Sequence, residues 1–408
     1  MSDAQRPDTL RPETLIATAG VATDPAYNSV SPPLHLSANY GWNDPLDKPQ
    51  YDYARSGNPT RTQLEEALAA LEGAARGVVV SSGMAALDLV LNLVDPGEIV
   101  LAPHDCYGGT HRLLTARAKR GQFELVYANQ TDPAELEAAF ARKPKLVLLE
   151  TPSNPLLRIT DIRAVVAHAK GCGAIVVADN TFLSPVLQRP LDLGCDIVVH
   201  STTKFINGHS DVVGGAVLAR DKALGDDLAW WANCTGVTGA PFDSFLTLRG
   251  MRTLFPRVER QQATAGDVVS RLAADDRVAN VYYPGLVNHP GHEIAKSQQN
   301  GFGSMFSVEF AENVDVIELL RNLNLFTIAE SLGGFESLVC TPATMTHAAM
   351  TPEAREVAGI SDRLVRFSIG LEHTDDLVRD IETALDRAVD SGAGKVAYLS
   401  SGATSKCA

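Results

Sequence analysis

The feature that most constrains the fold is an alternation of short apolar runs with amphipathic stretches between residues 60 and 250. Continuous apolar strands separated by helices are typical of a sheet that is covered on both faces, because crossover helices pack on each side. The alternation therefore predicts a largely parallel sheet in an α/β layer. The expected strands are Gly77–Val80, Ile99–Ala102, Glu124–Tyr127, Leu146–Leu149, Ile175–Ala178, Ile197–His200 and Gly215–Ala219, and helices are expected over Pro133–Ala141 and Ile162–Lys170.

The sequence changes character on either side of this region. Residues 1–60 are rich in Pro, Ser, Thr and Asn without sustained periodicity, so they are expected to form an arm that packs on another surface. A helix is expected to begin at Thr60, whose hydroxyl forms a capping box with Gln63, and to end at Gly73. After residue 250, strands are expected over Ser304–Phe310 and Leu364–Ile369, with helices over Val314–Leu323 and Asp375–Val389.

These patterns predict four segments. They are an arm over residues 1–60, a large domain over 61–252, a smaller C-terminal α+β domain over 253–390, and a Gly/Ser/Ala-rich tail over 391–408.

Composition narrows the class of protein. A formal net charge of −14 argues against a nucleic-acid surface, which would need clustered basic residues. No apolar stretch is long enough for a membrane helix, and the first residues lack the apolar core of a signal peptide. The six cysteines show no Cys-x-x-Cys spacing, which argues against a zinc ribbon or a disulfide framework. A cytoplasmic location is expected.

Lys204 is the most informative candidate residue. It follows an apolar strand and three small polar residues, and lysine is among the residues least often buried. Asp179 ends the preceding apolar run, and the carboxyl ends of parallel strands meet at one edge of a sheet. Such a lysine can form a Schiff base with pyridoxal phosphate, while the acid holds the pyridine nitrogen protonated. A lysine that emerges into solvent and an acid that caps a helix remain the alternatives.

Other residues fit the same hypothesis less specifically. Gly83 and Met84 open a helix after the first strand, where free N–H groups favour an anion such as phosphate. Ser201 and Thr203 could bind the same phosphate through their hydroxyl groups. Tyr107 could stack on a cofactor ring, or it is a core or turn tyrosine.

Two polar residues suggest further contacts. Asn154 could donate to a cofactor oxygen, although Asn before Pro is also a turn signal. Arg366 alternates onto the polar side of its strand, where a guanidinium could pair with a substrate carboxylate. A solvated edge arginine is the simpler reading of that residue.

Seven motifs, in this order, resemble the Cys/Met-metabolism family of pyridoxal-phosphate enzymes. The resemblance covers about residues 32–388 and is very specific for the family. The motifs are YDYARSGNPT (51–60), APHDCYGG (102–109), ETPSNPLLR (150–158), ADNTFLSP (178–185), HSTTKFINGHSD (200–211), WWANCTGVTG (230–239) and AESLGGFESL (329–338).

The resemblance implies an aspartate-aminotransferase-like fold, with a mostly parallel seven-stranded sheet and a smaller C-terminal α+β domain. It implies that Lys204 binds the cofactor and carries protons, and that Asp179 pairs with the ring nitrogen. The other implied cofactor contacts are Gly83, Met84, Asn154, Ser201, Thr203 and the stacking Tyr107, which is also expected to be catalytic. Tyr53 and Arg55 would reach the phosphate of a neighbouring subunit in a homotetramer.

The implied reaction is a γ-replacement that joins an O-acylhomoserine, with succinyl the expected acyl group, to cysteine. The expected substrate contacts are Arg112, Asn154, Glu330, Ser331 and Arg366, and Ser331 would also position Lys204. Ser56 stands where some relatives carry a second arginine, so the acyl group is left open among succinyl, acetyl and phospho.

Several alternatives remain. γ-Elimination and direct sulfhydrylation would use the same fold and cofactor. A nicotinamide-dependent oxidoreductase is disfavoured because no strand is followed by Gly-x-Gly-x-x-Gly. A non-catalytic binding module is disfavoured by the intact Lys204, Asp179 and Arg366.

Overall fold

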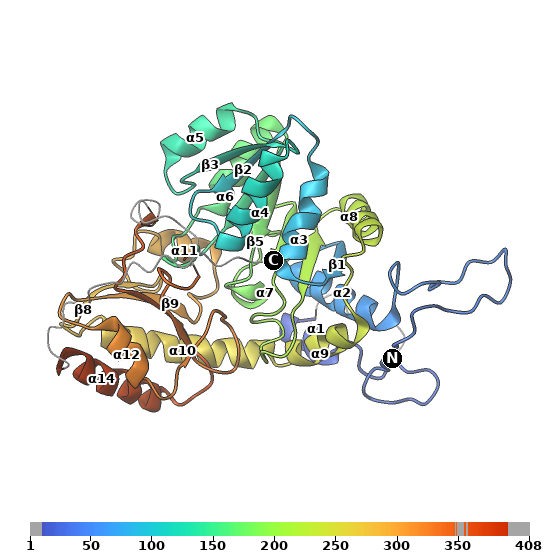
Figure 1. Cartoon of the computed structure of the whole chain (residues 1–408). Helices are drawn as coiled ribbons and strands as arrows, with labels where there is room; N and C mark the ends of the chain where they lie inside the picture. The colour runs from blue at the N-terminus through green and yellow to red at the C-terminus, as the bar shows by residue number, and fades with distance from the viewer. Residues whose placement is uncertain (1–9, 347, 349–354, 356–357, 391–408) are drawn as a thin grey trace, which may run out of the picture.

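Two β-sheets form the framework of the chain (Figure 1), whose computed structural model describes residues 10–346, 348, 355 and 358–390. The larger sheet has seven strands in the order β1-β7-β6-β5-β4-β2-β3. Every strand predicted in this region is present, with bounds that differ by at most one residue. The strands are β1 (Arg76–Val80), β2 (Ile99–Pro103), β3 (Glu124–Ala128), β4 (Leu146–Glu150), β5 (Ile175–Asp179), β6 (Ile197–His200) and β7 (Gly215–Ala219).

The larger sheet is mostly parallel, as predicted. Strands β2 to β6 pair in parallel, whereas β7 is antiparallel to both β6 and β1. The connection from β6 to β7 contains no helix, so the chain returns directly and reverses direction. The ends of β4, β5 and β6 therefore lie together at one edge.

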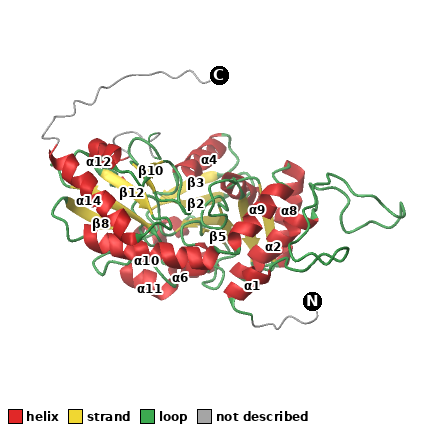
Figure 2. Ribbon diagram, turned by 90° about the horizontal axis from the view of Figure 1, so that it is seen from below, coloured by secondary structure: helices red, strands yellow, loops and turns green. Residues whose placement is uncertain are grey.

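Helices cover both faces of this sheet (Figures 1 and 2). One core packs beneath α3 (Gly83–Val90), α4 (Gly108–Lys119) and α8 (Lys222–Thr235), with the short 3-10 turn η2 (Leu91–Leu93) after α3. The core on the other face includes α2 (Pro59–Glu72), α5 (Pro133–Ala141), α6 (Ile162–Cys172), α7 (Ser184–Leu187) and α9 (Pro241–Met251). This double cover explains why the strands are apolar on both sides.

The smaller sheet has the strand order β10-β11-β12-β9-β8. The strands predicted at its centre are present as β9 and β12, and the two predicted helices are present as α12 and α14. One face packs against α10, α12 and α14. The elements are α10 (Leu254–Leu272), β8 (Val278–Tyr282), α11 (His292–Gln298), β9 (Met305–Phe310), α12 (Val316–Asn322), β10 (Thr327–Ile328), β11 (Leu338–Cys340), β12 (Leu364–Ser368) and α14 (Thr374–Asp390).

The arm contains a helix that the sequence pattern did not predict. Helix α1 (Pro12–Thr18) places Ile16 in the core of the larger sheet. With seven residues and one buried side chain, it is too short to show a helical repeat. The following part of the arm leaves the body as an extended loop (Figure 1), where Leu46 is 95% exposed.

The predicted start of α2 was wrong in its capping residue. Asn58 is the N-cap, and its side chain accepts hydrogen bonds from the N–H groups of Thr60 and Arg61. The Thr60 hydroxyl instead accepts from the N–H of His35 at 2.9 Å, which ties the helix to the arm. Pro59 at the first helical position favours this start because its fixed φ suits a helix. Gly73 ends the helix in a left-handed conformation, as predicted.

The boundaries of the four predicted segments are not tested by the structure. The segment boundaries at residues 60, 252 and 390 stay predictions, and the proposed tail lies outside the described residues. Within the described part of the chain, no helix is both long and apolar enough to cross a membrane.

The Asn58 cap gives a test of how strongly the arm is tied to α2. Its amide also donates to the carbonyl of His35 at 2.9 Å and to the hydroxyl of Tyr40 at 3.0 Å. We expect Asn58→Ala to lower the free energy of unfolding by about 1–3 kcal/mol, because both the cap and these bonds are lost. Urea denaturation would measure the loss.

Asn58→Asp is the matched variant, since it keeps the capping acceptor and removes the amide donors. We expect it to lie between Asn58→Ala and the unchanged protein. Equal stability of Asn58→Ala and the unchanged protein would contradict the assigned role.

Candidate active site

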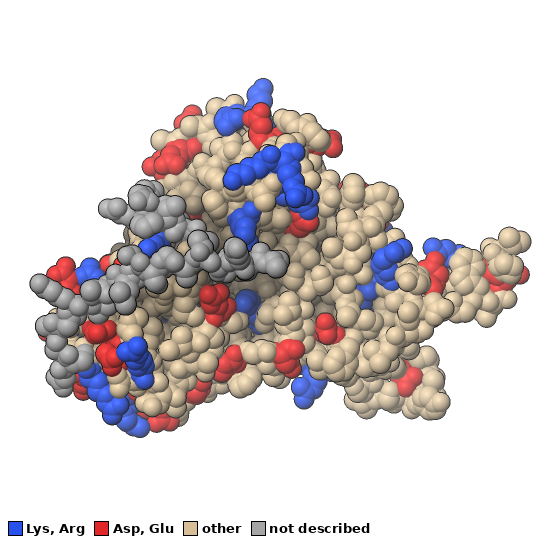
Figure 3. All heavy atoms as spheres, in the orientation of Figure 1, with Lys and Arg blue, Asp and Glu red and all other residues tan. Residues whose placement is uncertain are grey.

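A cavity of about 1400 Å³ lies between the two sheets, at the carboxyl ends of the parallel strands. Strand ends and loops of the larger sheet supply one wall, and Glu330, Leu332 and Arg366 come from the smaller domain. The space-filling view shows the corresponding hollow, with basic side chains along its upper rim (Figure 3). This edge is where ligands bind in open parallel sheets.

Lys204 lines this cavity from the turn that follows β6. Its Nζ donates to the Oγ of Ser331 at 3.0 Å, so a residue of the smaller domain holds the amine. Burial, and next the positive charge of Arg366, lower the pKa of Lys204 to about 8. A fraction of this amine is therefore unprotonated, and nucleophilic, near neutral pH. The solvent-exposed alternative for Lys204 is wrong.

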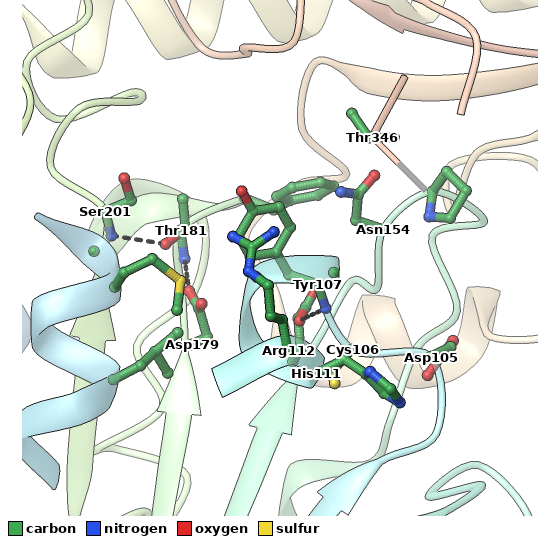
Figure 4. A pocket seen from close by; sticks show the side chains of 18 of the residues that line it. Asp105, Cys106, Tyr107, His111, Arg112, Asn154, Asp179, Thr181, Ser201 and Thr346 are labelled. Atoms are coloured by element: carbon green, nitrogen blue, oxygen red, sulfur yellow. Dashed lines mark hydrogen bonds between the residues drawn. The ribbon is translucent and has the colours of Figure 1, made fainter. Parts of the chain in front are cut away.

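Asp179 lines the same cavity from the end of β5 (Figure 4). Its Oδ1 accepts from the N–H of Thr181 at 3.0 Å. Burial raises the pKa of Asp179, whereas the bonds from Thr181 and the charge of His200 oppose that shift. A carboxyl group in this setting gains stability as an anion when a cation binds beside it.

Helix α3 begins beside this acid and opens toward the cavity, which Gly83 and Met84 line. Ser82 caps the helix by accepting from the N–H of Ala85. A side chain at position 83 would collide with Ser201, since a Cβ there would lie 2.7 Å from the Ser201 Cβ. Glycine thus lets the helix start approach Ser201, which also lines the cavity.

Thr203 reaches the cavity, but its hydroxyl already has two partners. It donates to the carbonyl of Gly214 at 3.2 Å and accepts from the N–H of the same residue at 3.0 Å. In this structure Thr203 therefore fixes the segment before β7.

Tyr107 is the N-cap residue of α4, and its side chain is 42% exposed at the cavity (Figure 4). Its backbone N–H donates to the Oε2 of Glu150 at 2.7 Å. Asn154, in the loop after β4, is buried at the same cavity. Its Oδ1 accepts from Nη1 of Arg366 at 3.0 Å, so the amide is held by the smaller domain.

Arg366 lies on β12, an interior strand, and is only 3% exposed. The predicted alternation is present: Val365 and Phe367 pack in the core of the smaller domain, and Arg366 points to the opposite face. That face meets the cavity, so the edge-arginine reading is wrong. The guanidinium also donates to the carbonyl of Ser331 at 3.1 Å. Two fixed bonds orient it toward an anionic ligand.

The remaining predicted residues lie at the rim or outside. Arg112, on α4, and Glu330 are exposed and line the cavity. Tyr53 and Arg55 are not among the residues that line the cavity of their own chain. Arg55 lies 5.5 Å from the ring centre of Tyr53, and its Nε donates to Asn233 at 3.0 Å.

Several charged residues that line the cavity were not predicted from the sequence. Glu150 ends β4 as Asp179 ends β5, and this shared position is the signal that could have identified it. Arg158 pairs with Asp105 at 3.1 Å and donates to the carbonyl of Ala358 at 3.0 Å. Arg158 and Asp105 do not stand out in an apolar pattern, because both lie outside the strands and helices.

The residues present fit pyridoxal phosphate. The N–H groups at the start of α3, with the hydroxyl of Ser201, offer donors to a phosphate. Asp179 offers a half-buried carboxylate to a protonated ring nitrogen, and Lys204 offers an amine of lowered pKa to an aldehyde. The whole donor set opens on one cavity.

The chain matches known proteins over almost its whole length. The family model for "Cys/Met metabolism PLP-dependent enzyme" matches residues 13–386. Cystathionine gamma-synthase of Escherichia coli (strain K12) is 50% identical, with 94% of this chain and 100% of that protein covered. Cystathionine beta-lyase of Lactococcus lactis subsp. cremoris (strain MG1363) is 44% identical, with 92% and 99% covered.

A solved structure confirms the fold. The cystathionine gamma synthase from Xanthomonas oryzae pv. oryzae, in complex with aminoacrylate and cysteine, is 55% identical and has a TM-score of 0.92. The match covers 94% of this chain and 100% of that chain. With the amine, the acid and the anion donors in one cavity, the chain belongs to the Cys/Met metabolism family of pyridoxal-phosphate-dependent enzymes.

Proposed function

We propose that this protein forms cystathionine from an O-acylhomoserine, with O-succinylhomoserine the expected donor, and cysteine by γ-replacement. The observation that carries the proposal is the single cavity shared by Lys204, Asp179 and Arg366. Similarity to gamma-synthases at 50% and 55% identity supports this reaction within the family.

We assign the cofactor contacts as follows. When bound, pyridoxal phosphate supplies an electron sink for the charge that develops at the amino-acid carbons. Asp179 stabilises the protonated ring nitrogen, Tyr107 covers the ring, and Asn154 contacts its hydroxyl. The start of α3, at Gly83 and Met84, holds the phosphate together with Ser201. Thr203 can donate to it as well if its hydroxyl gives up the bond to the Gly214 carbonyl.

Lys204 is the covalent attachment point and the proton carrier. Its lowered pKa lets the amine accept a proton near neutral pH and return it afterwards. Ser331 holds Nζ on the side of the smaller domain, where the amino acid is expected to bind. From there the amine takes a proton from Cα and must pass it on, which the bound cofactor would accept, before it can take a proton from Cβ. The acyl group then leaves the γ-carbon as a carboxylate.

The second substrate then completes the reaction. The thiolate of cysteine forms a bond to the γ-carbon, and Lys204 returns protons to Cβ and Cα. O-Succinylhomoserine and cysteine thereby give cystathionine and succinate, with no oxidant or reductant needed. Arg366 binds the α-carboxylate, because its guanidinium is buried and fixed by Asn154 and Ser331. Glu330 lies at the rim, where it can meet the ammonium group of a substrate.

The arm suggests that the site is completed by a second copy of the chain. Tyr53 and Arg55 lie on the arm just before α2, where Arg55 bonds to Asn233 of α8, and the arm also exposes Leu36 and Leu46. Part of the arm extends away from the body as a loop (Figure 1). We propose that they reach the phosphate of a neighbouring subunit in a homotetramer. An arm with exposed apolar side chains is expected to pack on another surface.

Elimination from cystathionine and sulfhydrylation of an O-acylhomoserine are the alternative reactions. γ-Elimination and sulfhydrylation use the same proton transfers, and the similarity to a cystathionine beta-lyase adds β-elimination. A substrate panel separates them: cystathionine formed from O-succinylhomoserine and cysteine supports the proposal. Ketobutyrate or pyruvate released from cystathionine, without that synthesis, would establish a lyase instead.

The role of Lys204 can be tested by removing its amine. We expect Lys204→Ala to abolish turnover and the absorbance of the lysine-linked cofactor, because no other amine is assigned to carry the protons. Absorbance spectra and a cystathionine assay would measure both effects. Lys222→Ala is the control, since this exposed lysine pairs with Asp226 and neither residue lines the cavity. Turnover that survives in the Lys204 variant refutes the assignment.

The role of Arg366 in binding the substrate can be tested in the same way. We expect Arg366→Ala to raise the KM of the amino-acid donor by about tenfold to a hundredfold, as the loss of charged hydrogen bonds worth about 1.5–3 kcal/mol predicts. The cofactor absorbance should remain, because Arg366 is assigned to the substrate. A variant that keeps its KM but loses the cofactor would show that the residue serves the cofactor instead.

Recognition of the acyl group of the donor can be tested at Arg112. Arg112 points its guanidinium into the open part of the cavity (Figure 4), where a distal carboxylate of a succinyl group can reach it. We expect Arg112→Gln to raise the KM for O-succinylhomoserine by about tenfold and to change that for O-acetylhomoserine little. Steady-state kinetics with both donors would measure this. An equal effect on the two donors would exclude a succinyl-specific role.

A further inference from the structure

Glu150 is a buried carboxylic acid that the proposed reaction does not use. It ends β4, lines the cavity and is 9% exposed. In the parallel pair of β4 and β5 it stands in register with Asp179. Two residues earlier, Leu148 and Val177 both pack in the core under α3, so the two acids alternate onto the same face. Their carboxyl groups are thus close neighbours.

Glu150 holds the backbone of two loops. Its Oε2 accepts from the N–H of Tyr107 at 2.7 Å, and the backbone of Asn154 also bonds to its carboxyl group. One loop follows β2 and the other follows β4. A single side chain therefore fixes the backbone of both residues proposed to contact the cofactor ring.

Glu150 and Asp179 have different charged neighbours. Burial, the charge of Asp179 and the charge of Asp105 raise the pKa of Glu150 well above its usual range. Asp179 has stabilising bonds from Thr181. Backbone bonds from Tyr107 and Asn154 oppose that shift at Glu150, but Glu150 faces two other acids, whereas the charge of His200 favours the Asp179 anion. A proton shared by the pair therefore belongs on Glu150.

The surroundings of this pair complete the arrangement. On the next strand, His200 contributes to the stability of the Asp179 anion, and its Nε2 lies 2.6 Å from the buried carboxylate of Glu72. Beside Glu150, burial and the charge of Asp105 raise the pKa of the Cys106 thiol and help keep it protonated. With Glu150 protonated, Asp179 is the ionised acid that would face the cofactor ring.

We propose that Glu150 is a positioning residue that works in its neutral form: it fixes the backbones of Tyr107 and Asn154 and leaves Asp179 as the anion beside the cofactor ring. The inference rests on the cofactor contacts proposed above. It does not depend on which reaction the enzyme catalyses.

The experiment measures cofactor binding to the full-length apo-enzyme. Glu150→Gln keeps an acceptor for the Tyr107 N–H and is permanently neutral, whereas Glu150→Ala removes the acceptor. We expect the dissociation constant of pyridoxal phosphate, from fluorescence titration, to rise about tenfold in Glu150→Ala and less than about threefold in Glu150→Gln. Glu65→Gln is the matched control. It changes a buried acid of α2 that pairs with Arg61 and Arg76.

A double-mutant cycle shows whether Glu150 acts through Tyr107. If it does, Glu150→Ala should weaken cofactor binding less in a Tyr107→Ala background than in the unchanged enzyme. Additive losses would show that Glu150 does not act through Tyr107, and they would overturn this part of the proposal.

The pH dependence of stability tests the protonation state and needs only folded Glu150→Gln. An acid whose pKa is raised on folding stabilises the protein at low pH, and that stability is lost as the pH rises through the folded-state pKa. The melting temperature of Glu150→Gln apo-enzyme, relative to the unchanged apo-enzyme, should therefore increase with pH. Asp275→Asn is the reference with the opposite sign, because the bond from Arg277 lowers the pKa of Asp275, so its relative melting temperature should fall as the pH rises.

Three outcomes would overturn the proposal. They are cofactor binding by Glu150→Ala as tight as in the unchanged enzyme, binding by Glu150→Gln as weak as by Glu150→Ala, or a relative melting temperature of Glu150→Gln that falls as the pH rises. A chain that binds the cofactor as expected but forms no cystathionine would refute the proposed reaction and leave the role of Glu150 standing.

Discussion

The parallel pairing of β4, β5 and β6 is the constraint on which the site depends. Because parallel strands end at the same edge, Glu150, Asp179 and the segment carrying Lys204 are brought together by backbone hydrogen bonds alone. Helix α3 begins at the same edge and directs its free N–H groups there. An amine, two acids and an anion site thus become neighbours through the pairing of the strand backbones.

The smaller domain turns this edge into a reaction site. Ser331 receives the Lys204 amine, and Arg366 bonds to both Asn154 and the Ser331 carbonyl. These contacts cross between the two parts of the chain and bury the charges. Burial and Arg366 together disfavour the ammonium form of Lys204, so the fold itself prepares the amine for reaction.

The sequence predicted the larger sheet well because its strands are covered on both faces, and an apolar run of one strand length then has few other readings. Lys204 and Asp179 could be identified because each breaks such a run at its end. Asn58 could not be identified as the cap of α2, since Thr60 fits a capping box equally well and only the packing of the arm decides between them.

The site was less predictable where it depends on contacts across the fold. Glu150 also ends an apolar run, but its importance lies in bonds to Tyr107 and Asn154 that no local pattern encodes. The reach of Arg55 depends on a second copy of the chain, and local periodicity carries no information about it. Arg366 was placed on the correct face of its strand, although only the docking of the two sheets shows that this face is buried.

Helix α10 connects the cores of the two sheets and keeps them at a fixed distance. Its first turns, at Leu254 and Val258, pack in the core of the larger sheet, and its last turns, at Val268 and Leu272, pack in that of the smaller one. A helix of 19 residues is about 28 Å long and resists bending, because a hinge within it would break several backbone hydrogen bonds. It acts as a rigid strut between the two cores, so adjustment to substrates of different length falls to the loops that border the cavity.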